Sequence, residues 1–223
     1  MLSISENVLI AYLTSGAKSK ISEFINKKIY KVSDTPLTYR QINSLDSDNL
    51  LSMDRENSKG WHTFSFKELV YLYIVSELKR FGLKHEQLNQ LWKAFFKEPT
   101  LANNKKVADI EINKGEGEMA LGCVFGAVEI TLCVDSAGQI VFYDTLNYSL
   151  LYQSSKPQIQ ISLNSVTNNL LAKFGYTQIP VTNSVQDAVL LWNSVDLTTK
   201  EEALLEIIRN EDYTTIQVMS TIK

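Results

Sequence analysis

The hydrophobic pattern of this chain changes its period near residue 105, and that change most constrains the fold. In the first hundred residues, apolar side chains recur three and four positions apart, as at Ile21, Phe24 and Ile25, which is the spacing of one buried helix face. Later runs alternate between apolar and polar residues, as in residues 138–143 and 158–163, and this period of two predicts strands. A run of helices followed by a strand-rich segment predicts an α+β fold.

We expect three regions along the chain. Residues 1–29 form an N-terminal helical arm, and residues 30–97 form a helical domain that polar residues 98–106 separate from the rest. Residues 105–223 form a β-sheet domain with packed helices. The elements expected in the arm are helices at 4–14 and 18–28, and those in the last region are strands within 119–132, 138–143, 158–163 and 212–222, a hairpin turn at 135–138, and helices at 165–174 and from Thr199.

The charge is distributed unevenly between these regions. The formal net charge is −3, but residues 18–97 hold 14 Lys and Arg against 9 Asp and Glu, whereas residues 105–223 hold 8 against 14. A basic first half and an acidic second half favour a nucleic-acid-binding role for the first half.

The composition argues against several classes of protein. No apolar run approaches the roughly 20 residues that a membrane span needs, and the first residues lack the features of a signal peptide. Cys123 and Cys133 fit a reducing compartment, and we expect both to be small buried hydrophobic residues in strands. The spacing of histidines and cysteines matches no metal-binding motif, so no metal and no cofactor are expected. The expected location is the cytoplasm, in association with the nucleoid.

We expect no enzymatic activity and no catalytic residues. Glu116, Glu118 and Glu129 could form a carboxylate cluster for acid–base chemistry, but a solvated loop and strand face is the favoured interpretation. Glycine-rich residues 115–126 lack the spacing of a phosphate-binding loop.

Residues 33–36, Ser-Asp-Thr-Pro, predict the start of a helix, because a capping residue followed by proline is typical of a first turn. The helix then runs over residues 37–47, with Leu37, Ile42 and Leu45 inward. Its opposite side carries hydroxyl, amide and guanidinium groups that suit base edges and phosphates. These outward candidates for DNA contact are Thr38, Tyr39, Arg40, Gln41 and Asn43.

Charged residues flank this helix at both ends. Lys27, Lys28 and Lys31 precede it, and they are either a solvated helix end, which is the favoured interpretation, or phosphate contacts. Asp46 and Asp48 would be repelled by phosphates, so we expect them at the end of the helix that lies away from DNA.

A β-loop, or wing, is expected after the helix. Residues 55–61 have a turn composition, and the alternation from Trp61 to Phe64 suits a short strand. Such a loop would lie on the DNA backbone beside the helix. The candidate wing contacts are Arg55, Lys59, Trp61 and His62. Ser65 and Glu68 then form a capping box for a core helix that ends at Gly82, and a further helix covers residues 84–96.

Two segments carry a resemblance to a known family. Residues 43–51, NSLDSDNLL, resemble the end of the recognition helix of MerR-type regulators, and residues 60–88 resemble the same family's wing, the helix behind it and the start of the next helix. Asn49 stands where the family has glycine, and His62 where it has arginine. The resemblance covers about residues 30–97. It implies a winged helix-turn-helix domain that binds DNA, usually as a dimer on a two-fold site.

Together these features predict a sequence-specific DNA-binding transcriptional regulator. Residues 38–47 would lie in the major groove and the wing of residues 55–62 on the backbone. The partners expected are double-stranded DNA and a second copy of the chain, with residues 105–223 serving dimerisation or an unknown small-molecule or protein effector. The alternatives are a plasmid- or phage-type DNA-organising factor for partition, conjugation or packaging, and a winged-helix module for protein interaction.

Overall fold

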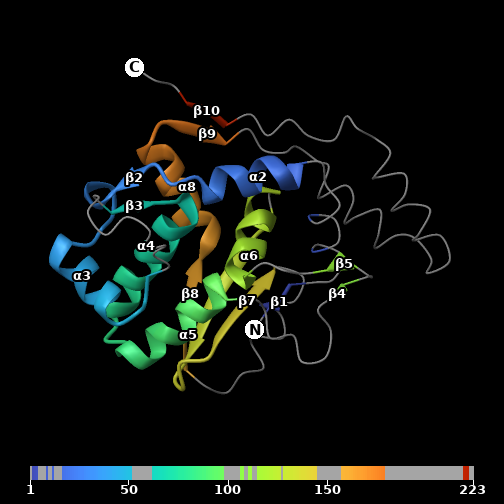
Figure 1. The fold of residues 1–223 in the computed structure, drawn as a ribbon. Coiled ribbons are helices and arrows are strands. Elements are labelled where there is room, and N and C mark those ends of the chain that lie inside the picture. The colour runs from blue at the N-terminus through green and yellow to red at the C-terminus, as the bar shows by residue number, and fades with distance from the viewer. Residues whose placement is uncertain are drawn as a thin grey trace.

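The computed structural model mixes helices with small sheets, as Figure 1 shows. It describes residues 2–4, 9, 12, 17–51, 62–97, 106–107, 110–111, 115–126, 128–144, 157–178 and 218–220. This mixture is consistent with the predicted α+β class, whereas the winged helix-turn-helix is not confirmed.

The first half is mainly helical. Strands β2 and β3 pair to form a two-stranded ribbon, and the short helix α3 lies between them in the sequence. Two longer helices, α4 and α5, follow β3. The elements in chain order are α2 (Ala17–Asn26), β2 (Tyr30–Lys31), the 3₁₀ helix η1 (Val32–Asp34), α3 (Tyr39–Ser47), β3 (Thr63–Phe64), α4 (Phe66–Arg80) and α5 (His85–Phe96).

The second half contains the main sheet, whose strand order is β1-β7-β6-β8. β1 pairs in parallel with β7, and the other neighbours are antiparallel. Its elements are β1 (Leu2–Ser3), α6 (Glu116–Phe125), β6 (Ile130–Asp135), β7 (Ile140–Asp144), β8 (Gln158–Ser162) and α8 (Leu163–Lys173). Two further antiparallel pairs join β4 (Lys106–Val107) to β5 (Ile110–Glu111), and β9 (Tyr176–Gln178) to β10 (Val218–Ser220).

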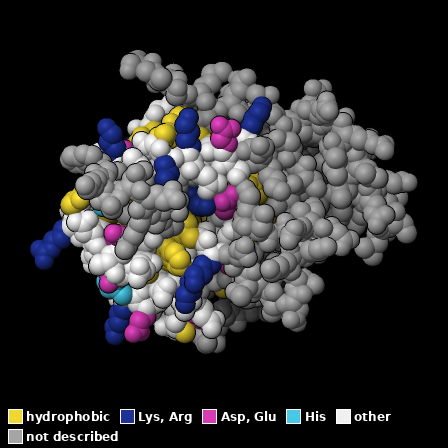
Figure 2. All heavy atoms as spheres, in the orientation of Figure 1, with side chains coloured by type: hydrophobic (Ala, Val, Ile, Leu, Met, Phe, Trp, Pro, Cys, Tyr) yellow, Lys and Arg dark blue, Asp and Glu magenta, His cyan; other side chains and the backbone are white. Residues whose placement is uncertain are grey.

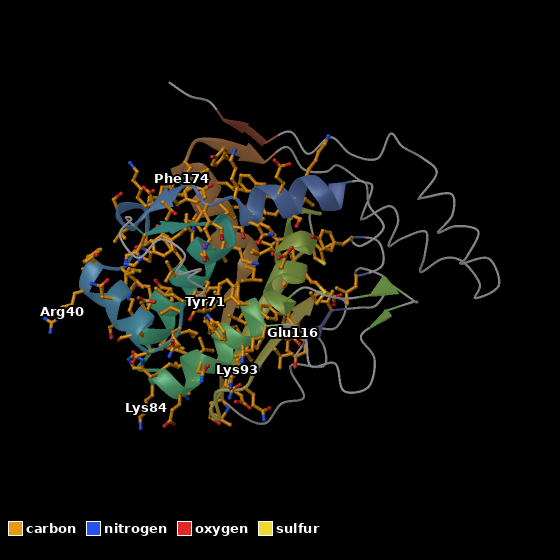
Figure 3. The ribbon with its side chains drawn as sticks, viewed as in Figure 1. Arg40, Tyr71, Lys84, Lys93, Glu116 and Phe174 are labelled. Atoms are coloured by element: carbon orange, nitrogen blue, oxygen red, sulfur yellow. The ribbon has the colours of Figure 1, made fainter. Side chains whose placement is uncertain are left out.

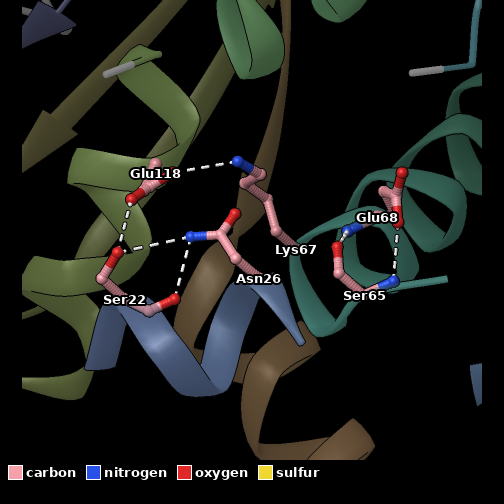
Figure 4. Close-up of polar contacts among 6 residues, drawn as sticks. All are labelled: Ser22, Asn26, Ser65, Lys67, Glu68 and Glu118. Carbon is pink, nitrogen blue, oxygen red and sulfur yellow. Dashed lines mark hydrogen bonds and ion pairs between the residues drawn. The ribbon is translucent and has the colours of Figure 1, made fainter. Parts of the chain in front are cut away.

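Helix α4 contacts four other helices, α2, α5, α6 and α8. The Ser65 hydroxyl accepts a hydrogen bond from the Glu68 N–H at 3.2 Å, and the Glu68 carboxylate accepts one from the Ser65 N–H at 2.6 Å, so the predicted capping box is confirmed (Figure 4). Apolar residues surround most of the helix rather than one stripe, which is the pattern of a helix buried on several sides.

One hydrophobic core includes residues from both halves of the chain. Aromatic rings pair across them: the ring centroids of Phe66 and Phe125 lie 6.0 Å apart, and those of Phe95 and Phe142 lie 5.7 Å apart. The Tyr30 ring lies 4.8 Å from that of Phe174. The described parts of residues 30–97 and of residues 105–223 therefore share buried surface, while the linker predicted between them lies almost entirely outside the described residues.

Several predicted elements are confirmed. The helices at 18–28, 84–96 and 165–174 correspond to α2, α5 and α8, and the strands at 138–143 and 158–163 correspond to β7 and β8. The hairpin turn at 135–138 is closed by the Gly138 N–H, which donates to the Asp135 carbonyl at 2.9 Å. β10 lies within the strand predicted at 212–222, whereas the helix predicted from Thr199 lies outside the described residues.

The strand predicted at 119–132 is wrong over most of its length, because Glu116–Phe125 forms helix α6. All ten residues of α6 are buried, so the sequence has no polar face to mark a helical period, and a short apolar run of this kind cannot be assigned by periodicity alone. The prediction of a solvated carboxylate face also fails here, since Glu116 and Glu118 are only 8% and 5% exposed. Only Glu129 of that group is exposed.

Both cysteines are buried, as predicted, but Cys123 lies in α6 rather than in a strand. Cys133 lies in β6. Burial raises the pKa of the Cys123 thiol, with a smaller contribution from the charge of Asp144, and it raises the pKa of Cys133 to about 11. Both side chains therefore stay protonated near neutral pH and act as small apolar residues.

Candidate nucleic-acid interface

Helix α3 is held to the core by one face. Leu37, just before it, and Ile42 and Leu45, within it, are 6%, 0% and 0% exposed, so the predicted inward face is confirmed. The helix ends at Ser47, and two residues later Asn49 has a φ of 55°, which places it in the left-handed region that asparagine tolerates. The chain then turns back to Leu50, whose N–H donates to the Leu45 carbonyl at 2.8 Å.

The buried hydroxyl of Tyr71, in the middle of α4, secures the end of α3. It donates a hydrogen bond of 2.9 Å to the Leu50 carbonyl oxygen. Burial raises the pKa of the Tyr71 hydroxyl, so this group remains a donor at any physiological pH. The sequence does not reveal this contact, because the two residues are far apart in the chain and Tyr71 occupies a position typical of an ordinary core residue.

Five residues in or next to α3 are predicted to contact DNA. Three of them take no part in the hydrogen bonds that cap the helix, and these are Tyr39, Arg40 and Asn43. All three side chains are exposed, and Tyr39 is 53% exposed although it is a large aromatic residue. Figure 3 shows Arg40 extending away from the body of the protein. Arg40 is in none of the ion pairs formed among the described residues.

The other two predicted helix residues, Thr38 and Gln41, cap the helix. The Gln41 side-chain oxygen accepts hydrogen bonds from the Thr38 N–H at 2.8 Å and from the Thr38 hydroxyl at 2.9 Å, and the Gln41 N–H donates to that hydroxyl oxygen at 3.3 Å. A bidentate contact of Gln41 with a base needs its amide oxygen, and the cap already uses that oxygen. Both side chains are exposed, but their main local role is to start α3.

This cap also corrects the predicted helix start. The residues predicted to begin the helix, 33–36, instead belong to η1 and the turn after it, and α3 begins at Tyr39. The Asp34 carboxylate accepts a hydrogen bond from the Lys31 N–H at 2.7 Å, which favours the 3₁₀ turn. Proline at residue 36 then stands in the short connection to Thr38, where no backbone N–H is needed.

Replacing Thr38 with alanine is expected to lower the free energy of unfolding by about 1 kcal/mol, because the first turn of α3 loses its side-chain cap. Urea unfolding of the full chain measures this. Thr38→Ser keeps the hydroxyl and should retain most of the stability. Equal losses in the two variants would show that the cap does not stabilise α3.

The ribbon of β2 and β3 lies beside the N-terminal end of α3. His62, just before β3, has its ring centroid 5.8 Å from that of Tyr39 and 6.5 Å from that of Phe64. The partly buried His62 thus joins the exposed ring of Tyr39 to the buried ring of Phe64. The other predicted wing residues, Arg55, Lys59 and Trp61, lie outside the described residues.

A helix-turn-helix needs a helix directly before the recognition helix. Residues 30–34, which would supply it, form strand β2 and the 3₁₀ helix η1. Strand β2 pairs with β3, with Tyr30 opposite Phe64 and Lys31 opposite Thr63. In this part of the chain α3 is therefore a single helix supported by a ribbon and by α4.

The acidic residues lie at the C-terminal end of α3, where they were expected. Asp46 is in its last turn and Asp48 follows it. The Asp48 carboxylate lies 3.0 Å from Nδ1 of His85 at the start of α5. Both side chains are largely exposed, so this contact adds little stability.

Lys173, at the end of α8, connects the second half to the segment before α3. Its ammonium group donates to the Asp34 carbonyl oxygen at 2.7 Å and to the Tyr73 hydroxyl at 3.2 Å. It also lies 5.5 Å from the centre of the Phe174 ring. No sequence signal pointed to this contact, because Asp34 and Lys173 are 139 residues apart.

The described residues hold no group of three or more His, Cys, Asp or Glu side chains that could bind a metal ion. None of the described helices is both long and apolar enough to cross a membrane. No protein-family model matches the chain, and neither the curated proteins nor the solved structures contain one with significant similarity to it.

Proposed function

We propose that this chain is a regulator that binds double-stranded DNA, with the outward face of α3 in the major groove. The observation that supports it most is that Tyr39, Arg40 and Asn43 are exposed on one side of a helix whose opposite side is fully buried. Guanidinium and amide groups form bidentate contacts with guanine and adenine, and a tyrosine hydroxyl can bond a phosphate oxygen.

The position of α3 also suits this role. It lies at the edge of the molecule, with α4 and the rest of the core behind it (Figure 1), so a groove could receive it without displacing other described elements. The buried contacts of Leu45 and Leu50 and the Tyr71 hydrogen bond hold the helix rigidly, and a rigid reading helix loses little entropy on binding. We further propose that the chain acts as a dimer in the cytoplasm, since a single short helix gives modest affinity and symmetry doubles the contacts.

The direct test selects duplexes from a random pool with the full-length chain and then measures binding of the enriched sequence. Arg40→Ala is expected to weaken binding about tenfold or more and, if Arg40 contacts a phosphate, to reduce the magnitude of the negative slope of log K against log salt by about 0.9. Alanine favours a helix, so the substitution should not unfold α3.

Arg80→Ala removes the same charge from the end of α4 and is the matched control, because Arg80 is paired with Glu77 at 3.1 Å. The affinity of the Arg80→Ala variant for the selected duplex should stay near that of the wild type. Failure of the wild-type chain to retain any duplex at low salt would contradict the proposed function. Equal losses in the two arginine variants would contradict the placement of α3. Footprinting that shows extended coverage rather than a short symmetric site would contradict a regulator.

A further inference from the structure

A second basic surface lies next to α3, on the segment that connects α2 to β2. It consists of Lys27, Lys28 and Lys31, and we call it the β2 lysine strip. All three side chains are exposed. Lys27 and Lys31 form no ion pair within the part of the chain that the structure describes, whereas Lys28 is paired with Glu68, with Nζ and Oε1 3.8 Å apart.

The ribbon determines where this strip faces. Tyr30 and Phe64 are buried on the inner face, so Lys31 and its cross-strand neighbour Thr63 lie on the outer face. The Ile29 N–H donates to the Phe64 carbonyl at 3.1 Å, which extends the pairing by one residue. The side chain of Ile29 is 46% exposed, so the outer face continues back toward the end of α2.

The charges around the strip are mostly positive. Among the described side chains from α2 to η1 and at the neighbouring ends of α4 and α8, the lysines are Lys20, Lys27, Lys28, Lys31, Lys67 and Lys173, and the carboxylates are Glu23, Asp34 and Glu68. Of these lysines, Lys67 is paired with Glu118 of α6. Asp34 and Glu68 each accept a backbone N–H, of Lys31 and Ser65 respectively, so part of their negative charge is already compensated. Figure 2 shows basic side chains over α2 and β2 and at the outer edge of α3.

We propose that the β2 lysine strip binds the sugar-phosphate backbone of the same duplex that α3 reads, and so extends the interface beyond the groove. The proposal rests on the proposed function. Lys27 and Lys31 are four residues apart, so their Cα atoms are at most about 14 Å apart, which is far enough for the two side chains to contact different phosphates of one strand. Lys31 belongs to the ribbon that His62 adjoins, and the His62 ring lies beside Tyr39 of α3, so the ribbon connects the two surfaces.

The fixed backbone distinguishes this strip from an ordinary solvated helix end. Lys31 is held by strand pairing and by the Asp34 carboxylate, and residues 30–34 are tied to α8 through Lys173. A preorganised row of cations loses less entropy when it binds phosphates than cations on a free loop would. A contact of this kind would raise affinity for every sequence without reading bases.

The experiment compares two double variants with equal charge loss. Lys27→Gln/Lys31→Gln changes the strip, and Lys84→Gln/Lys93→Gln changes two exposed lysines at α5, which Figure 3 shows away from β2. Filter binding of one selected duplex is measured at several salt concentrations. In the strip variant the magnitude of the negative slope of log K against log salt should fall by about 1.8, and in the α5 variant by much less. Lys28 is left unchanged because it lies near the buried Glu68 carboxylate.

Two further outcomes separate this proposal from the proposed function. If Arg40→Ala weakens binding but the strip variant keeps the wild-type slope, the strip proposal is wrong and α3 remains the interface. If both double variants lose the same slope, the effect is one of net charge and the strip proposal is also wrong. If the wild-type chain binds no duplex, the proposed function itself fails. Lys27→Arg/Lys31→Arg should keep the wild-type slope, which checks that loss of charge is responsible.

Discussion

Replacing Lys67 with methionine is expected to lower the free energy of unfolding by about 3–5 kcal/mol, because it leaves a buried carboxylate without its cation. The Lys67 ammonium group lies 2.9 Å from Oε2 of Glu118, and the two side chains are 14% and 7% exposed. The other Glu118 oxygen accepts a hydrogen bond from the Ser22 hydroxyl at 3.1 Å. This group of residues joins α4, α6 and α2, as Figure 4 shows, so the loss should affect the whole fold.

Two comparisons make this prediction specific. Lys67→Met/Glu118→Met removes both charges and should be less destabilised than Lys67→Met alone, since no uncompensated charge remains. Arg80→Met removes one partner of the pair with Glu77, whose side chains are 74% and 44% exposed, and should cost less than about 1 kcal/mol. Guanidinium chloride unfolding of the full chain measures all three. A loss in Lys67→Met no larger than that in Arg80→Met would contradict a structural role for the buried pair.

Local sequence features predicted the parts of the structure that depend on near neighbours. The inward positions of Ile42 and Leu45 follow from helical spacing opposite a polar face, and the cap of α4 follows from serine and glutamate three residues apart. The left-handed backbone at Asn49 follows from its place at the end of a helix. In each case the residues that determine the structure lie within one or two turns of each other.

The features that sequence analysis missed depend on distant partners. Helix α6 has no polar face because it is covered on all sides, so its pattern resembled a buried strand. Glu118 appeared solvated because nothing in the sequence indicates that a lysine 51 residues earlier neutralises it. The candidate site shows the same division: the exposure of Arg40 was predictable from the helical pattern, whereas the support that Lys173 gives to Asp34 was not.

The shared core has a consequence for regulation, if the chain binds DNA as we propose. Helix α4 holds the end of α3 through Tyr71 and also forms the buried pair with α6 through Lys67. A ligand or partner that shifts α6 or α8 would therefore act on the elements that position α3 without an intervening flexible linker. Under the proposed function, small shifts in packing are therefore a more direct route of regulation than rotation of one independent domain against another.

Gly122→Ala is expected to destabilise the protein by about 1–3 kcal/mol, although alanine is normally preferred to glycine inside a helix by about 1 kcal/mol. A Cβ atom built on Gly122 would overlap the ring of Tyr12, which is only 1% exposed. Glycine is therefore needed at this position for space rather than for backbone conformation, because Gly122 does not have a positive φ. Thermal or urea unfolding of the full chain measures the effect.

The double variant Tyr12→Ala/Gly122→Ala tests the mechanism. Tyr12→Ala alone removes a large buried ring and should itself destabilise the protein by about 3–5 kcal/mol, by analogy with other large aromatic residues. Once the ring is absent, the extra methyl group has room, so the double variant should be at least as stable as Tyr12→Ala. If Gly122→Ala costs the same in both backgrounds, the Tyr12 ring does not pack against α6 at Gly122.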